Sequence, residues 1–209
     1  MQMERLYDQA MYTTHLLYLH GFRSSPQSAK ALRMAAVVRQ DFPGVTWWCP
    51  QLPPSPKLAM AQIMAKISAW PNAAGFQSMA VVGSSLGGFY ATWVAEKMGC
   101  KAVLLNPAID PARDLHRYIG EQTTWQAPDD KFFFKPEFIG ELQMLQAGLL
   151  KQAKNHLAVI AKGDEVLDWR EMSARYSGTH LRILEGGDHA LSDFDDHLPE
   201  ILEFLKLAA

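Results

Sequence analysis

Residues 80–90 read AVVGSSLGGFY, in which a glycine-rich turn joins one apolar run to another. Within this stretch, Gly83-Ser84-Ser85-Leu86-Gly87 fits the pattern G-x-S-x-G, with Ser85 at its centre. The pattern is typical of a nucleophile elbow, where a strand reverses sharply into a helix and the central hydroxyl is exposed above a sheet. It also occurs by chance in tight turns of small residues. If the turn is an elbow, the spacing selects Ser85 as the nucleophile and leaves Ser84 as its small neighbour.

Six short apolar runs along the chain, each followed by turn or polar residues, predict buried strands. Between most of them lie segments with helix-forming residues at helical spacing. Strands that alternate with helices indicate an open, mainly parallel sheet with helices on both faces, because each right-handed crossover needs a helix to return the chain. The expected strands are residues 16–19, 45–49, 79–82, 102–105, 157–161 and 181–184, and the expected helices are residues 29–40, 57–70, 86–98, 171–176 and 199–207.

The alternation breaks in residues 109–150, which are rich in aromatic and charged side chains. We expect this segment to be partly helical and to lie over the sheet, after the fourth strand, in the manner of a lid. Its apolar side chains are candidates to line or cover an acyl pocket; the alternatives are that they belong to the core or to a dimer surface. The aromatic candidates are Trp125, Phe132, Phe133 and Phe134, and residues 142–150 supply the aliphatic ones.

Length and charge limit the classes of protein to which this chain can belong. Its 209 residues suffice for one substantial core, so we expect a single domain over residues 1–209. Lys and Arg number 20 against 22 Asp and Glu, which gives a formal net charge of −2. No basic field favours nucleic acid or an anionic membrane as a partner.

The cysteines and the hydropathy of the chain favour the cytoplasm. Cys49 and Cys100 lack paired spacing, which argues against a disulfide framework and against a cysteine zinc site. Residues 1–15 mix charged and polar side chains, so we expect no signal peptide there. No later segment approaches the ~20 apolar residues that a membrane span requires.

Two aspartates after the fifth predicted strand are candidates for the acid that would orient a catalytic histidine. In elbow enzymes the acid and then the histidine follow the serine, at later strand ends. Asp164 comes soon after the strand and directly after Gly163, where a short loop can hold a carboxylate against an imidazole. Asp168 lies farther along, in the position of a helix N-cap. Asp164 is therefore the preferred acid, and Asp168 is the reserve.

His189 is the best candidate for the base among the 7 histidines of the chain. It follows the last predicted strand and the Gly186-Gly187 loop, whereas the other late histidines have no matching strand end. The alternative is that His189 is an ordinary surface residue. No two histidines have the close helical spacing of a metal site, so we expect neither a metal nor a cofactor.

The first predicted strand ends at His20-Gly21-Phe22, which is a candidate oxyanion loop. The backbone N–H of Phe22 and that of Leu86, directly after the serine, are the expected donors to an oxyanion. We interpret His20 as a structural residue of this loop rather than as a second base.

Taken together, these elements resemble the α/β-hydrolase superfamily, over nearly the whole chain after about Thr14. More narrowly, the chain is similar to the small bacterial YqiA/YcfP-like esterases. That resemblance implies a Ser85-Asp164-His189 triad and the hydrolysis of carboxylic esters or acyl thioesters. We expect a small-molecule substrate and a protein that is a monomer or a homodimer. The segments that carry it are LLYLHGFRSSPQSAKA, VVGSSLGGFYATWVAEK, LLNPAIDP, KGDEVLDW and EGGDHALSDF.

Other functions remain open at the level of sequence. The same machinery serves peptidases, lactonases and acyltransferases, since a fold and a triad do not choose the leaving group. A binding protein built on a hydrolase scaffold is a further alternative, although it would not need the complete set of serine, acid and histidine. Arg23, beside the predicted oxyanion loop, is a candidate to meet an anionic group such as a phosphate of an acyl-CoA, or is simply a solvated arginine.

Overall fold

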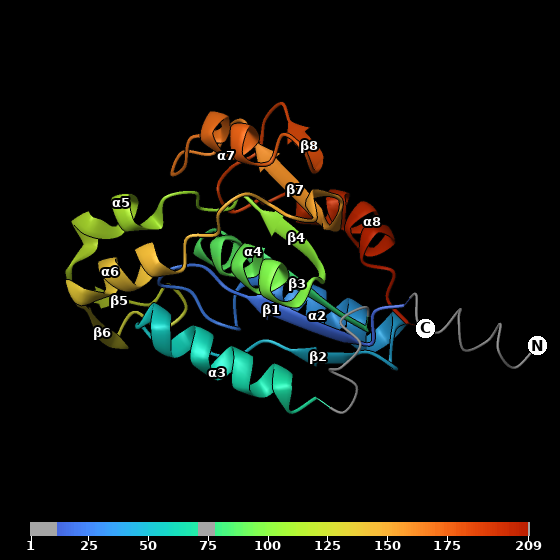
Figure 1. Ribbon diagram of the computed structural model, residues 1–209, viewed down its shortest axis with the longest axis horizontal. Helices are drawn as coiled ribbons and strands as arrows, with labels where there is room; N and C mark the ends of the chain where they lie inside the picture. The colour runs from blue at the N-terminus through green and yellow to red at the C-terminus, as the bar shows by residue number, and fades with distance from the viewer. Residues whose placement is uncertain (1–11, 71–77, 209) are drawn as a thin grey trace, which may run out of the picture.

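The structure, a computed structural model, describes residues 12–70 and 78–208 (Figure 1). At its centre is a six-stranded sheet with the strand order β2-β1-β3-β4-β7-β8, in which every neighbouring pair is parallel. The predicted sheet is thereby confirmed, while most of residues 1–15, where we expect no signal peptide, lies outside the described residues. The strands are β1 (His15–Leu19), β2 (Thr46–Trp48), β3 (Met79–Ser84), β4 (Lys101–Leu105), β7 (His156–Ala161) and β8 (His180–Leu184).

Helices cover both faces of this sheet, as the crossover argument predicts. In β1, Leu16 and Tyr18 pack into one buried cluster with α2 and α8, whereas Leu17 and Leu19 pack into the other with α3, α4 and α7. Because the central strands are buried on both faces, their sequences are continuous apolar runs rather than alternating ones. The helices are α2 (Ala29–Asp41), α3 (Pro56–Ser68), α4 (Leu86–Met98), α7 (Trp169–Arg175) and α8 (Phe194–Leu205).

The last helix begins earlier than the sequence predicts. The predicted helix starts at Pro199, but α8 begins at Phe194 and contains the proline. Phe194, Leu198, Ile201 and Leu205 form one buried stripe that continues across Pro199. Burying such side chains stabilises the helix by about 1.5–3 kcal/mol each, which offsets the ~3 kcal/mol that an interior proline costs.

Residues 109–150 form a compact excursion that gathers on one side of the molecule (Figure 1). Helices are present as expected, but they flank an antiparallel hairpin of β5 and β6 that we did not predict. The apolar run Phe132-Phe133-Phe134 is shorter than the apolar runs from which the sheet strands are predicted, and β5 (Gly120–Thr123) has no apolar run, so neither strand is indicated by the sequence. The elements are α5 (Pro111–Leu115), η2 (His116–Tyr118), β5 (Gly120–Thr123), β6 (Lys131–Phe134) and α6 (Glu137–Met144); η3 (Ala153–Asn155) precedes β7.

The apolar side chains of the excursion divide between core and surface. Phe134 and Leu142 are buried in the cluster beneath α3 and α4, so for Leu142 the core alternative is correct, whereas Phe134 also lines a cavity described below. By contrast, Phe133 is 57% exposed and Trp125 is 64% exposed. Glu141 on α6 also accepts hydrogen bonds from the Ser55 hydroxyl and the Lys57 N–H at the start of α3. The excursion is thus attached to the body of the protein by buried side chains and by polar contacts.

Candidate active site

The turn between β3 and α4 has the geometry of an elbow. Ser85 has φ 57° and ψ −121°, in the region that non-glycine residues rarely adopt. Two glycines are required by close contact: a Cβ on Gly83 would lie 2.1 Å from the Gly87 carbonyl oxygen, and one on Gly87 would lie 1.9 Å from the Leu19 carbonyl oxygen. Ser84 is the last residue of β3 and is buried, whereas Ser85 lines an open cavity.

Ser85, His189 and Asp164 form one chain of hydrogen bonds across three strand ends. Ser85 Oγ lies 3.0 Å from His189 Nε2, and His189 Nδ1 lies 2.7 Å from Asp164 Oδ2. The Asp164 side chain is 0% exposed, and its other oxygen accepts the Val166 and Leu167 N–H groups at 2.8 Å each. The carboxylate is therefore both buried and fully bonded, which fixes its orientation toward the imidazole.

Asp168 has a different position, although it is only four residues from Asp164. It is the N-cap of α7, and its Oδ1 accepts the Arg170 N–H at 2.8 Å. Its capping role explains why α7 begins two residues before the predicted start. The structure thus brings Asp164, and not the reserve acid Asp168, to the histidine.

The predicted oxyanion donors lie beside the serine. Phe22 and Leu86 line the same cavity as Ser85 and His189. Leu86 is the first residue of α4, so its N–H has no acceptor within the helix. In the described part of the chain, neither the Phe22 N–H nor the Leu86 N–H donates to a protein acceptor. Both groups are accordingly free to donate to a substrate oxygen.

His20 holds the loop that carries Phe22. Its Nδ1–H donates to the Gly21 carbonyl oxygen at 3.0 Å, and its Nε2 accepts the Leu52 N–H at 3.1 Å. Burial lowers the pKa of His20, which favours the neutral ring that this pair of hydrogen bonds requires. The contacts match the interpretation of His20 as a structural residue.

Asn106, which the sequence did not single out, links the acid strand to the histidine loop. It is fully buried and has φ 42°. Its Oδ1 accepts the Ala161 N–H at 2.8 Å, while its Nδ2 donates to the Asp188 and His189 carbonyl oxygens at 2.9 and 3.3 Å. In the sequence, the pair Asn106-Pro107 at the end of a predicted strand is equally typical of an ordinary turn, so it does not single out Asn106.

Two further side chains hold the His189 loop from other directions. Glu165 Oε2 accepts the His189 N–H at 3.0 Å, and Lys30 Nζ on α2 donates to the Ala190 carbonyl oxygen. Burial lowers the pKa of Lys30 to about 8, against the opposing effects of the Asp188 and Asp164 carboxylates. Since 160 residues separate Lys30 from Ala190, nothing local in the sequence signals this contact.

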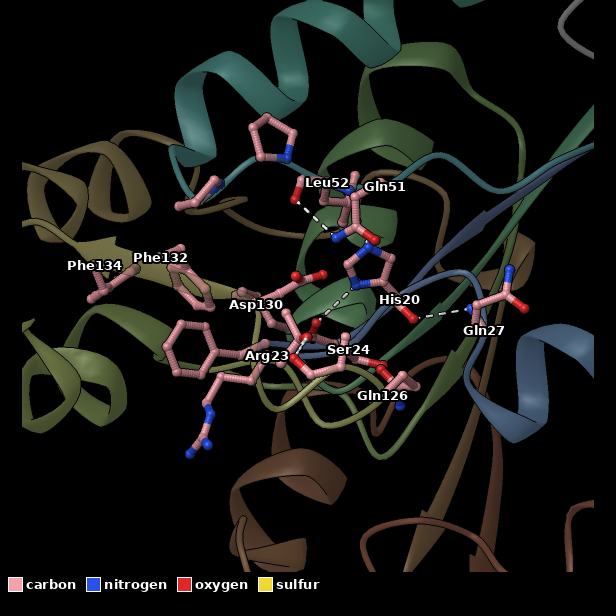
Figure 2. A pocket seen from close by; sticks show the side chains of 18 of the residues that line it. His20, Arg23, Ser24, Gln27, Gln51, Leu52, Gln126, Asp130, Phe132 and Phe134 are labelled. Carbon is pink, nitrogen blue, oxygen red and sulfur yellow. Dashed lines mark hydrogen bonds between the residues drawn. The ribbon is translucent and has the colours of Figure 1, made fainter. Parts of the chain in front are cut away.

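Two cavities flank the oxyanion loop and share Phe22, Arg23 and Leu86 in their walls. The first, here called the serine cavity, has a volume of about 620 Å³ and contains Ser85 and His189. The second, here called the His20 cavity, has a volume of about 660 Å³ (Figure 2). Aromatic and amide side chains form much of its wall, which also includes the charged residues Arg23, Asp130 and Lys131. The aromatic and amide residues are Phe22, Tyr90, Phe132, Phe134, Gln27, Gln51, Gln62 and Gln126.

Other kinds of catalytic centre have little support in the structure. Among the described residues, no group of three or more His, Cys, Asp or Glu side chains could hold a metal ion. Burial raises the pKa of the Cys49 and Cys100 thiols to about 12 each, so neither is an activated nucleophile.

No helix in the described part of the chain has the length and apolar character to cross a membrane.

A family model described as "Uncharacterised protein family (UPF0227)" matches residues 15–206. The chain belongs to this family. The match covers the whole sheet and all of the residues discussed above, from β1 to α8. This family match supports the resemblance found in the sequence, and so does the α/β-hydrolase fold of similar solved structures.

Three solved structures illustrate the fold. The mouse alpha/beta hydrolase domain-containing protein 10 matches with a TM-score of 0.67 and 13% identity, over 92% of this chain and 91% of that one. Monoacylglycerol lipase from Paleococcus ferrophilus gives 0.65 and 14%, over 93% and 96% of the two chains. Est1E from Butyrivibrio proteoclasticus gives 0.64 and 16%, over 96% and 88%. The predicted α/β-hydrolase fold is confirmed.

Proposed function

We propose that this protein is a serine hydrolase that cleaves carboxylic esters or acyl thioesters through an acyl-enzyme intermediate. The observation that carries the proposal is the unbroken chain from Ser85 Oγ to His189 and from His189 to Asp164, with distances of 3.0 and 2.7 Å. These distances are those expected between a nucleophile and its base, and between a base and the group that orients it.

Acylation begins when Ser85 Oγ attacks the carbonyl carbon of the substrate and His189 Nε2 takes the hydroxyl proton. Asp164 accepts the Nδ1–H of the ring, which keeps Nε2 free to act as a base and stabilises the imidazolium that forms. The N–H groups of Phe22 and Leu86 donate to the developing oxyanion, and losing one such donor typically costs about a hundred- to a thousandfold in rate. His189 then protonates the leaving group as the carbonyl reforms.

Deacylation uses the same groups in the same positions. Water attacks the acyl carbon while His189 Nε2 takes its proton, and the proton then passes to Ser85 Oγ as the acid product leaves. The contacts of Asn106, Glu165 and Lys30 hold the His189 loop, so little reorganisation is needed between the two steps.

Esters and thioesters are the first choice among acyl compounds. Peptidase, lactonase and acyltransferase activities would use the same three side chains, but none of the described contacts favours an amide, a lactone or a second acceptor. The solved structures with this fold include an esterase from Pyrococcus furiosus and a monoacylglycerol lipase. A binding protein without catalysis would gain nothing from a serine, a base and a buried acid aligned in this way.

The test compares the purified protein with its Ser85→Ala variant. We expect a fluorophosphonate probe to label the wild type and not the variant, because the probe reacts with an activated serine. Turnover of p-nitrophenyl esters of graded chain length and of acyl-CoA thioesters should fall by about 10⁵-fold or more in the variant. An unlabelled wild type, or equal turnover by both proteins, would reject the proposal.

The setting of the reaction is part of the same proposal. We place the protein in the cytoplasm, acting on a small-molecule substrate as a monomer or a homodimer. Cys49 and Cys100 are free thiols, in keeping with a reducing compartment. Fractionation of cells and light scattering on the purified protein test the compartment and the oligomeric state.

A further inference from the structure

The serine cavity is lined by three arginines, Arg23, Arg113 and Arg117, and they differ in their partners. Arg113 is neutralised: its Nε lies 2.8 Å from Asp114 Oδ1, and its two Nη atoms lie 2.9 and 2.8 Å from the Glu171 carboxylate oxygens. Such a bidentate pair satisfies most of the donors of a guanidinium. Arg113 therefore joins α5 to α7 and has little capacity left to bind a ligand.

Arg23 is held in a fixed orientation without a carboxylate. Its Nε donates to the Thr123 carbonyl oxygen at 2.7 Å, its Nη2 donates to Thr123 Oγ1 at 3.0 Å, and its guanidinium carbon lies 4.2 Å from the centre of the Trp125 ring. No Asp or Glu of the described chain forms an ion pair with it. Nη1 keeps both of its donors, so a positioned and uncompensated charge faces the cavity.

The backbone at Arg23 supports a role in binding. This residue directly follows Phe22 in the oxyanion loop and has φ 59°. Glycine or asparagine adopts that conformation at least cost, whereas other residues are rarely found there. In Figure 2 the Arg23 side chain points away from His20, Gln51 and Leu52, which line the His20 cavity. The loop thus directs the guanidinium toward the side on which the serine cavity lies.

Arg117 adds a second uncompensated charge to the same wall. Its guanidinium carbon lies 5.0 Å from the centre of the Tyr118 ring, and within the described ranges it too has no acidic partner. The single carboxylate in the lining of the serine cavity, that of Asp114, already pairs with Arg113. The lining therefore carries an excess of positive charge beside Ser85.

The chemistry of the proposed reaction assigns the two cavities to the two halves of an ester. His189 must protonate the leaving group, so the leaving group lies on the side of His189, in the serine cavity. The His20 cavity shares the oxyanion loop but does not include His189, and its aromatic and amide walls suit the acyl part. We propose that Arg23 and Arg117 bind an anionic group, a carboxylate or a phosphate, on the leaving group of the substrate. This inference rests on the proposed function.

The experiment uses matched esters whose leaving groups differ in charge. The neutral ester is 4-butyryloxybenzamide, and the anionic esters are 4-butyryloxybenzoate and 4-butyryloxyphenyl phosphate. For each enzyme, the ratio of kcat/KM for an anionic ester to kcat/KM for the neutral one is measured. Dividing the wild-type ratio by that of a variant cancels the intrinsic reactivity of the esters. The carboxylate and phosphate arms show which anion is preferred.

We expect Arg23→Gln to lower this ratio by about tenfold, because a positioned, partly buried guanidinium loses its charge. The more exposed Arg117→Gln should lower it by about threefold, and Arg23→Lys should restore part of the loss. The matched control is Arg113→Gln combined with Asp114→Asn: it removes from the same lining an arginine together with the carboxylate that it neutralises, so the net charge is unchanged and the ratio should stay within twofold of the wild-type value.

Three results would overturn the inference. One is an equal ratio in the wild type and in Arg23→Gln, with the neutral ester still hydrolysed. Another is a ratio that falls as far in the control with Arg113→Gln and Asp114→Asn as in Arg23→Gln. The third is an Arg23-dependent preference for mono-p-nitrophenyl glutarate over p-nitrophenyl valerate, which would place the anion on the acyl half. Failure of the wild type to hydrolyse any ester or to react with a fluorophosphonate would instead reject the proposed function itself.

Discussion

The carboxyl ends of β3, β7 and β8 and the excursion of residues 109–150 face the same cavity but are built differently. At the strand ends, the polar side chains are buried and their hydrogen bonds are complete, as in Asp164 and Asn106. In the excursion, Trp125 and Arg117 are exposed, and Arg117 has no acidic partner in the described chain. The sheet therefore holds the proposed reacting groups in place, whereas the excursion supplies groups that can still bind a ligand.

The largest change in kcat is expected at the strand ends, where Asp164 and Asp168 are the two candidate acids. Asp164→Asn should lower kcat by about 10⁴-fold, because an amide at this position favours the wrong tautomer of the histidine. Asp168→Asn should change kcat by less than about twofold, since asparagine is also a good N-cap for α7. Steady-state kinetics with one p-nitrophenyl ester measures both variants.

The pair of variants serves as its own control, because both changes replace a carboxylate by an amide of the same size. Circular dichroism of each variant checks that the fold is retained. If Asp168→Asn proves the more damaging, the assignment of the acid is wrong, and the bond between Asp164 and His189 has no catalytic role.

A smaller effect is expected from the residue that positions the histidine. Asn106→Asp keeps the shape of the side chain and an acceptor for the Ala161 N–H, but it removes the two donors to the carbonyl oxygens of Asp188 and His189. Displacing a catalytic group by about 1 Å costs on the order of 10²-fold. We therefore expect kcat to fall by about 10- to 100-fold with KM nearly unchanged.

Asn155→Asp is the matched control for this variant. Asn155 also donates to a backbone carbonyl oxygen, that of Gly99 at 3.3 Å, but it is only half-buried and lies before β7, at the opposite end of that strand from Asp164. Its replacement should leave kcat within twofold of the wild-type value. A fall in KM alone, or equal kinetics for Asn106→Asp and Asn155→Asp, would show that Asn106 does not position the base.

The sheet and the juxtaposition of Ser85, His189 and Asp164 were predictable because each depends on short segments of sequence. The buried strands are continuous apolar runs, and the crossover rule then orders them into a parallel sheet. The glycines around Ser85 are required by close backbone contact, so the elbow is visible in the sequence itself. Asp164 and His189 followed from the rule that function gathers at strand ends.

What could not be predicted depends on contacts between distant segments. The hairpin of β5 and β6 is defined by pairing across the loop 124–130 and not by alternation within Phe132-Phe133-Phe134. The start of α8 depends on burial of Phe194 against the sheet, which outweighs the signal from Pro199. Likewise, nothing near Lys30 in the sequence indicates its contact with Ala190.

The smallest expected effect is a loss of stability when the excursion is detached from α3. Glu141→Ala removes the acceptor of the Ser55 hydroxyl, at 2.7 Å, and of the Lys57 N–H, at 3.0 Å, and so releases α6 from the start of α3. Hydrogen bonds to a charged group contribute about 1.5–3 kcal/mol, and partial exposure reduces this, so we expect a loss of about 1–2 kcal/mol in the free energy of unfolding. The Tm measured by calorimetry should fall by about 2–8 °C.

Glu137→Ala, on the same helix, is the control for that loss, because Glu137 is exposed and lies 3.8 Å from Lys135 in a weak surface ion pair. Its Tm should stay within about 2 °C of the wild-type value. For neutral esters, kcat should change little in either variant, since the strand ends and not α6 hold the reacting groups. A large fall in kcat in Glu141→Ala, with Ser85 still accessible to a fluorophosphonate, would mean that the excursion also orders the reacting groups, and the division between the two regions would not hold.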